Sequence, residues 1–192
     1  MTVAYVVRCN FARADLETAW NDWYSGPKLK QMLAKPMFLT GQRFYREAGP
    51  GRNYLAFWVL ESPAAFETHE YKSDWGFFEW KPHITDWSRD LFEPMSAGFA
   101  PPRVGDGQRL HIVAYDGAAD DAAVAADRAA VSAARPGIVW MRIVGLDRHS
   151  PYMGVEVVPT GPLPTLAAGH RARIQTLYKP ISIFGECEMA SR

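Results

Sequence analysis

Cysteine is scarce in this sequence, with Cys9 and Cys187 as its only two copies. They form no Cys-x-x-Cys pair and have no His at metal-ligand spacing, which argues against both a disulfide framework and a zinc site. The chain also lacks an apolar run of the roughly 18 residues that span a membrane, and its first residues do not have the pattern of a secretion signal. We therefore expect a cytoplasmic protein that does not enter a membrane.

An excess of charge of one sign is also missing. The chain has 21 basic and 21 acidic residues, and no run of Lys or Arg stands out. It lacks the basic surface by which proteins bind nucleic acid or anionic membranes. Because 48% of its residues are hydrophobic, it has ample material for a core, and a small molecule is the expected partner.

The first half predicts the order strand, helix, two strands, helix, strand. A β-rich opening ends at Asp15, which is a suitable helix cap. Gly49-Pro50-Gly51 is a hairpin turn, and Ser62-Pro63 is a suitable start for a long aromatic-rich helix that ends near Pro94. The expected strands are residues 3–11, 38–46, 54–60 and 91–99.

The same order of signals begins again after a Pro- and Gly-rich linker at residues 100–108. Pro36 corresponds to Pro136 and Tyr54 to Tyr152, so the spacing of the signals is nearly conserved between the halves. The expected strands are residues 110–115, 138–146, 152–158 and 177–184, and the expected helices are residues 120–134 and 163–174. We therefore predict two βαββαβ modules, residues 1–99 and 109–192, that arose by duplication.

The segment at residues 23–29, Trp-Tyr-Ser-Gly-Pro-Lys-Leu, precedes Pro36 and the pair Arg43-Phe44 on the second expected strand. This pattern resembles a motif of EthD-like members of the dimeric α+β barrel superfamily. The resemblance implies an α+β fold in which two tandem ferredoxin-like modules form an intrachain dimeric α+β barrel, with a ligand cavity between sheet and helices. Lys28 stands where the motif has His, which weakens the case for any activity that depends on that His.

Members of this superfamily include cofactor-independent monooxygenases, muconolactone-type isomerases, aromatic polyketide cyclases, aldoxime dehydratases and haem peroxidases. The fold alone therefore does not select a reaction. The cyclases place a Tyr and a His in the region that corresponds to His69 and Tyr71, which makes these two residues candidates. By analogy with the haem branch, His170 is a conceivable haem ligand, although a position on the surface explains it better.

The expected active cavity lies in the first module, where aromatic and ionisable residues gather. Lys28 follows Tyr24 by four residues and can share its helical edge, unless Pro27 breaks the helix. Arg43 and Tyr45 share one face of a strand, where a buried Arg would need an anionic partner. The predicted catalytic residues are Lys28, His69, Tyr71 and His83, and the predicted substrate-binding residues are Trp20, Tyr24, Arg43, Tyr45, Trp80 and Trp87.

Each of these residues also has a purely structural interpretation. Aromatic side chains at helical spacing, such as Trp80 and Trp87 with Ile84 and Leu91, are typical of core packing. A His in an aromatic setting, such as His83, is often a hydrogen-bonded structural residue. The orientation of Arg43 stays open, because one sequence does not orient the sheet.

The leading functional hypothesis is a cofactor-independent lyase or isomerase that acts on a small aromatic or polyketide-like carboxylate. Its sharpest form is a decarboxylase, in which Lys28 or Arg43 anchors the carboxylate and His83, His69 or a Tyr delivers the proton. The alternatives are a cofactor-free monooxygenase and a non-catalytic small-molecule-binding or stress-response barrel. The protein would be a monomeric pseudo-dimer or a homodimer, without a cofactor or a metal.

The sequence contains neither a phosphate-binding glycine loop nor a cluster of metal ligands. Freshly purified protein should therefore show neither a Soret band nor a flavin spectrum, and chelators should leave any activity intact. Absorption spectroscopy and metal analysis check this expectation. Stoichiometric haem, flavin or zinc would contradict it.

Overall fold

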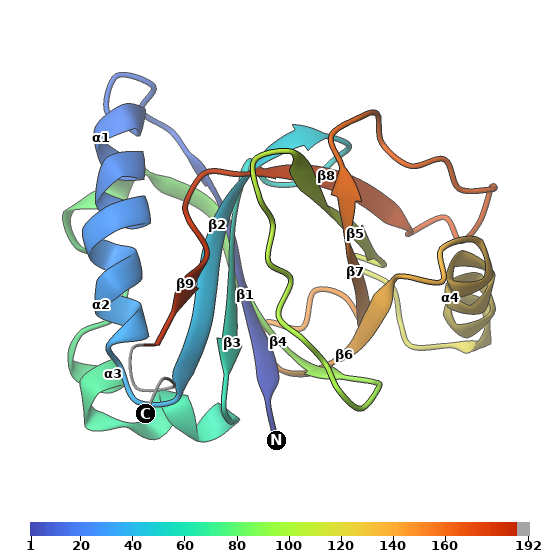
Figure 1. Ribbon diagram of the computed structural model, residues 1–192, viewed down its shortest axis with the longest axis horizontal. Helices are drawn as coiled ribbons and strands as arrows, with labels where there is room; N and C mark the ends of the chain where they lie inside the picture. Colours follow the sequence, from blue (N-terminus) through green and yellow to red (C-terminus); the bar gives the residue numbers. More distant parts are fainter. Residues whose placement is uncertain (188–192) are drawn as a thin grey trace.

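The computed structural model describes residues 1–187, and an antiparallel sheet that closes on itself forms its centre (Figure 1). The strands follow the order β3-β1-β4-β6-β7-β5-β8-β2, and β2 pairs back with β3, so eight strands form a closed barrel. A short additional strand, β9 (Gly185–Glu186), pairs with β2. Closure gives each barrel strand a neighbour on both sides, which removes the open sheet edges.

Each half of the chain contributes four strands in the same spatial order. The first half supplies β1 (Val3–Phe11), β2 (Phe38–Ala48), β3 (Tyr54–Leu60) and β4 (Ile84–Pro94), arranged β2-β3-β1-β4. The second half supplies β5 (Gln108–Ala114), β6 (Val139–Leu146), β7 (Tyr152–Pro159) and β8 (Ile174–Pro180), arranged β6-β7-β5-β8. The halves join where β4 pairs with β6 and where β2 pairs with β8.

Helices lie on the outer sides of the barrel, on opposite sides of the molecule (Figure 1). In the first half, α1 (Glu17–Trp23) and α2 (Leu29–Leu33) run nearly end to end along the sheet, followed later by α3 (His69–Ser73). Two 3₁₀ turns, Pro63–Glu67 and Phe78–His83, flank α3. The second half places α4 (Ala122–Ala134) on its own sheet.

Strand β1 shows how alternation builds two cores. Tyr5 and Val7 point toward the helices, whereas Ala4 and Val6 point into the barrel, because successive strand side chains face opposite sides. All five residues from Val3 to Val7 are buried, which explains why the segment is almost uniformly apolar. The helix side of this sheet is where the aromatic residues of the first half gather.

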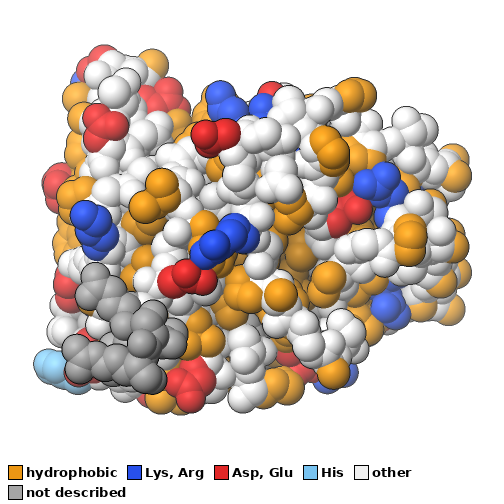
Figure 2. Space-filling model, viewed as in Figure 1, with side chains coloured by type: hydrophobic (Ala, Val, Ile, Leu, Met, Phe, Trp, Pro, Cys, Tyr) orange, Lys and Arg blue, Asp and Glu red, His pale blue; other side chains and the backbone are white. Residues whose placement is uncertain are grey.

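The surface agrees with the absence of net charge. On the face shown in Figure 2, Lys and Arg side chains are interspersed with Asp and Glu. Within residues 1–187, no helix has the length and apolar character needed to cross a membrane.

The first helical segment begins one residue later than predicted. It continues through Pro27, which confirms that Lys28 lies on the same helical segment as Tyr24. Its N-cap is Leu16 rather than Asp15, because the Asp15 carboxylate pairs with Arg13. A π-helical turn at Tyr24–Lys28 carries the chain past Pro27 and into α2. A wider turn changes the hydrogen-bond pattern around the proline, which has no N–H to donate.

The long aromatic helix predicted after Pro63 is wrong. Only short helical turns occur before Ile84, and Ile84–Pro94 is a strand that pairs with β1. Pro82 cannot donate a helical hydrogen bond, and pairing with β1 satisfies the backbone instead. The predicted helical stripe through Trp80 and Trp87 therefore does not form, and Trp87 is 39% exposed.

The helix predicted at residues 163–174 is wrong as well. Most of this segment, which contains Pro164, is irregular up to the start of β8. Its end is held by Asp127 of α4, which accepts a hydrogen bond from the His170 backbone N–H at 2.9 Å and pairs with Arg173 at 3.0 Å. Residues 188–192 of the predicted second module lie outside the described residues.

Gly49, next to β8 at the junction of the two halves, offers a test of the barrel closure. Its φ is +85°, and a methyl group there would overlap the carbonyl oxygen of Gln175. Both features disfavour a side chain, so Gly49→Ala should lower the free energy of unfolding by about 2 to 4 kcal/mol. Chemical denaturation measures this loss. Gly161→Ala is the control, since nothing lies within 4 Å of its added carbon, and equal losses in the two variants would contradict the prediction.

Candidate functional site

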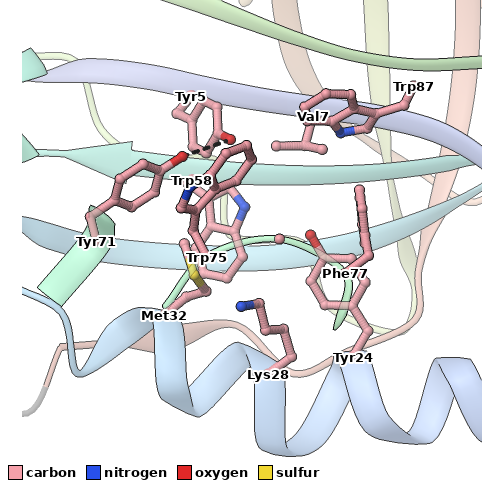
Figure 3. Close-up of a pocket in the computed structure, with 11 residues that line it drawn as sticks. Tyr5, Val7, Tyr24, Lys28, Met32, Trp58, Tyr71, Trp75, Phe77 and Trp87 are labelled. Atoms are coloured by element: carbon pink, nitrogen blue, oxygen red, sulfur yellow. Dashed lines mark hydrogen bonds between the residues drawn. The ribbon is translucent and has the colours of Figure 1, made fainter. Parts of the chain in front are cut away.

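A small cavity lies between the first sheet and the helical segment that carries Lys28 (Figure 3). The volume of about 30 Å³ is enough for about one or two water molecules. An organic ligand can therefore enter only if part of the lining moves. The lining comprises Tyr5 and Val7 of β1, Trp58 of β3, Trp87 of β4, Tyr24, Lys28 and Met32 of the helical segment, Tyr71 of α3, and Trp75, Gly76 and Phe77 of the following loop.

Two larger hollows adjoin the cavity at the loop formed by residues 74–79. The outer groove, of about 530 Å³, is lined by Trp75, Gly76, Phe77, Phe78, Lys81, Ile84 and Trp87. The side recess, of about 380 Å³, is lined by Trp23, Pro27, Lys28, Gln31, Asp74, Phe78 and Glu79. Both volumes fall within the range of roughly 300 to 1,000 Å³ that is usual for ligand pockets. The loop lines all three spaces, so its position decides whether they are separate or joined.

Lys28 is the cation of the cavity and is only 4% exposed. Its Nζ donates a hydrogen bond to Gln31 Oε1 at 2.8 Å and lies 4.7 Å from the centre of the Phe78 ring. Burial lowers the pKa of Lys28 to about 8, against the opposing effect of the Asp74 carboxylate and with a smaller lowering by Lys35. Near neutral pH, a far larger fraction of Lys28 is therefore in the neutral amine form than of an ordinary lysine.

Three phenols surround the same space. The Tyr5 and Tyr71 hydroxyls are 3.5 Å apart, and both side chains are about 5% exposed or less. Burial raises the pKa of Tyr5 and of Tyr24 well above the ordinary value. Tyr5 and Tyr24 therefore keep their protons at neutral pH and can donate hydrogen bonds to a bound oxygen atom.

The loop closes the cavity by stacking. The Trp75 ring stacks on Tyr71 with centroids 5.9 Å apart and on Trp87 with centroids 6.3 Å apart. The Arg89 guanidinium lies 4.9 Å from the ring centres of both Trp75 and Trp87. These contacts hold the loop onto the sheet, although Trp75 itself is 41% exposed.

Among the predicted site residues, the structure brings Lys28, Tyr24, Tyr71 and Trp87 together at this cavity. It does not bring Arg43 there. Arg43 faces the helix side of β2 and is 1% exposed, with its guanidinium 4.1 Å from the centre of the Tyr24 ring. It donates hydrogen bonds to Ser25 Oγ at 2.8 Å and to Asn21 Oδ1 at 3.0 Å. The guanidinium is thus hydrogen-bonded and covered by protein groups. Burial lowers the pKa of Arg43 to about 10.

The predicted histidines also lie away from the cavity lining. His69 is exposed at the start of α3. The half-buried His83 ring packs edge-on against the Phe11 ring, with the ring centroids 6.0 Å apart. Their placement follows from the turns that replace the predicted long helix, which separate both residues from Lys28. The ring of His170 accepts a hydrogen bond from the Ala172 N–H at 3.2 Å in the second half of the chain.

The remaining aromatic candidates pack elsewhere in the first half. Trp20 is fully buried and stacks on Phe11 with centroids 4.5 Å apart. Trp80 packs between Phe11 and Trp23, and Tyr45 packs against Tyr54. Trp20, Trp80 and Tyr45 therefore support the helical layer behind the cavity.

Several lining residues were not predicted from the sequence. Tyr5 and Trp58 come from strands whose alternation could have assigned them to the helix-facing side, had the orientation of the sheet been known. Trp75 and Phe77 flank Gly76, which has a φ of +107°, and this short motif by itself carries no signal for a cavity. Within residues 1–187, no group of three or more His, Cys, Asp or Glu side chains is placed to hold a metal ion.

Comparisons with known proteins support the fold. No family model and no curated protein matches the sequence. A proposed monooxygenase from Lactobacillus acidophilus NCFM is similar in structure at a TM-score of 0.54 and 11% identity, over 97% of both chains. An anthrone oxidase-like protein is similar at a TM-score of 0.60 and 8% identity, over 97% of this chain and 94% of the other.

A proposed monooxygenase from Fusobacterium nucleatum subsp. nucleatum ATCC 25586 is also similar, at a TM-score of 0.55 and 9% identity, over 96% of this chain and 94% of the other. At these identities the likeness concerns the fold, an α+β architecture around a closed antiparallel barrel.

The buried amine predicts a pH-dependent effect on stability. The pKa of Lys28 is about 8 in the folded chain, below its ordinary value of 10.5, so its charged form opposes folding. Lys28→Met should therefore stabilise the protein at pH 7, by on the order of 1 kcal/mol. The gain should shrink as the pH rises from 8 to 10.5, because the folded wild-type chain then holds the amine in its neutral form, and above 10.5 the amine is neutral in both states.

Thermal unfolding across this pH range measures the effect of Lys28→Met. Lys30→Met is the control, because Lys30 is exposed on the same helical segment. A stabilisation that did not change with pH would contradict the assignment of a buried amine.

Proposed function

We propose that the protein is a cofactor-independent oxygenase that acts on a small phenolic or polyketide-like aromatic compound in the Lys28 cavity. The observation that carries this proposal is the Lys28 amine, which is 4% exposed and has a pKa of about 8. It is a suitable general base at neutral pH. The names of two structural neighbours, a proposed monooxygenase and an anthrone oxidase-like protein, support the same class of reaction.

The chemistry suits a substrate with an acidic methylene group next to aromatic rings. The neutral Lys28 amine would remove one proton from this carbon, and the resulting carbanion would add molecular oxygen to form a peroxide anion. The Lys28 ammonium would return the proton, and the hydroperoxide would lose water to leave a carbonyl group. Overall, one CH₂ group and one O₂ become one C=O group and one water.

The phenols of the cavity have a defined part in this scheme. The Tyr5 and Tyr24 hydroxyls, whose pKa values are raised by burial, would donate hydrogen bonds to the oxygen that gains charge as the proton leaves. The stacked rings of Tyr71, Trp75 and Trp87 would pack on the faces of the substrate. They would also exclude water from the carbanion.

Decarboxylation is the second candidate, because Lys28 could also anchor a carboxylate and Tyr71 could deliver a proton. It is less well supported, since Arg43, His69 and His83 do not line the cavity. The other expected acid, base and anchoring groups are therefore missing from the site.

We also propose that the two halves of the chain are duplicated ferredoxin-like modules, residues 1–99 and 109–192. Their identical strand orders support this proposal. The second half has α4 but an irregular segment where a second helix was expected. On this proposal, the module at residues 1–99 carries the reactive cavity, and the second module is mainly structural.

Oxygen uptake during incubation with hydroxylated polycyclic aromatics tests the proposed reaction. We expect one O₂ consumed per carbonyl product, with one ¹⁸O atom in the product from ¹⁸O₂ before exchange with water. Lys28→Met should lower kcat by about 10²- to 10⁴-fold, whereas Lys30→Met should not. Release of CO₂ without oxygen uptake would favour decarboxylation, and full recovery of a bound ligand would favour a binding protein.

A further inference from the structure

The loop at residues 74–79 covers a cavity too small for any organic substrate. The cavity of about 30 Å³ shares Trp75, Gly76, Phe77 and Trp87 with the outer groove of about 530 Å³. It shares Lys28 with the side recess of about 380 Å³. Moving the loop away from the helical segment would join these spaces into one that can hold a ligand of several rings.

A chain of hydrogen bonds ties the first residue of this loop to Lys28. Lys28 Nζ donates to Gln31 Oε1 at 2.8 Å, and Gln31 Nε2 donates in turn to Asp74 Oδ2. Lys35 Nζ lies 3.8 Å from the same carboxylate oxygen and donates to the Glu70 carbonyl at 2.6 Å. Gln31 thus bridges the amine and the loop, with one end of its amide bound to each.

The other end of the loop also touches Lys28. Phe78 places its ring 4.7 Å from Lys28 Nζ and packs edge-on against Trp23. Its φ of +49° is unfavourable for an aromatic residue, at a cost of about 1 kcal/mol or more. The contacts of the Phe78 ring with Lys28 and Trp23 offset this strain. Gly76, with a φ of +107°, provides the conformational freedom that a moving segment needs.

We propose that Gln31 is a positioning residue that couples closure of the loop at residues 74–79 to burial of the Lys28 amine. In the closed state, the loop excludes water from Nζ and the Asp74–Gln31 link holds it toward the cavity. In the open state, substrate enters through the joined hollows and water solvates the amine. The catalytic meaning of this coupling rests on the proposed function, in which Lys28 is the base.

The pKa of Lys28 can distinguish the effect of loop closure from the effect of the charges near the amine. Asp74 and Lys35 carry the charges that act on the amine, Glu79 lines the recess, and the phenols of Tyr5, Tyr24 and Tyr71 line the cavity. The Asp74 charge raises the pKa of Lys28, whereas burial lowers it and is the larger effect. Removing the charge alone should therefore lower the pKa, and opening the loop should raise it.

Two substitutions of Asp74 should shift the pKa of Lys28 in opposite directions. Asp74→Asn removes the charge but keeps an oxygen that can accept from Gln31 Nε2, so the loop should stay closed and the pKa of Lys28 should fall below about 8. Asp74→Ala removes the acceptor as well. The loop should then open, and the pKa should rise toward the ordinary value of 10.5.

The pKa is measured by ¹³C NMR titration of protein labelled at the lysine Cε, with the Lys28 signal assigned by its loss in Lys28→Met. Gln31→Met is the second test, because it breaks both links without touching a charge, and it should also raise the pKa. Circular dichroism and thermal unfolding check that each variant is folded. The Cε signal of the exposed Lys30 provides an internal reference for the comparison between variants.

The coupling is overturned if Asp74→Ala or Gln31→Met lowers the pKa of Lys28 or leaves it at the wild-type value. It is also overturned if Asp74→Asn raises the pKa as much as Asp74→Ala does. These titrations need no substrate, so their failure would leave the proposed oxygenase reaction standing. Conversely, a protein without oxygen uptake could still show the coupling.

Discussion

Pairing between the two halves of the chain is the constraint on which the rest of the structure depends. β2 pairs with β8 and β4 pairs with β6, so the strands at the two edges of one half find their partners in the other. The backbone groups of these strands are thereby satisfied without an outside partner. One face of each sheet is then committed to the barrel core, and only the other face remains for helices and for a ligand cavity.

The first half uses its remaining face differently from the second. Its helical segment packs through Trp20, Leu29 and Met32 against the sheet, but the short turns after β3 leave a gap between helix and sheet. Lys28 projects into this gap from the helical segment (Figure 3). The lowered pKa of Lys28 is a consequence of this placement, because water that would solvate its charge is excluded by the surrounding rings and by Met32.

Arg43, which packs on Tyr24, and Lys28, which lines the same cavity as Tyr24, are buried cations with different surroundings. The Arg43 guanidinium is bound by Asn21 and Ser25 and covered by the rings of Trp20 and Tyr24. In the described part of the chain, Lys28 Nζ makes one hydrogen bond, to Gln31, whose side chain also binds Asp74 of the loop. A planar group with several donors is well suited to fixed packing, whereas the compact amine can gain or lose a proton with little rearrangement.

The sequence by itself determined the strand-helix-strand-strand order of each half, the hairpins and the Ala-rich helix, because alternation, turn residues and capping act within a few neighbouring residues. The same local signals placed Lys28 four residues, or about one helical turn, beyond Tyr24. The sequence also predicted a fourth strand, but only the tertiary structure decided that it begins at Ile84 and not near Leu91, since pairing with β1 outweighs a helical spacing of apolar residues. Tertiary packing likewise decided which side chains line the cavity, because the orientation of Arg43, the exposure of His69 and the stacking of Trp75 depend on contacts between segments far apart in the chain.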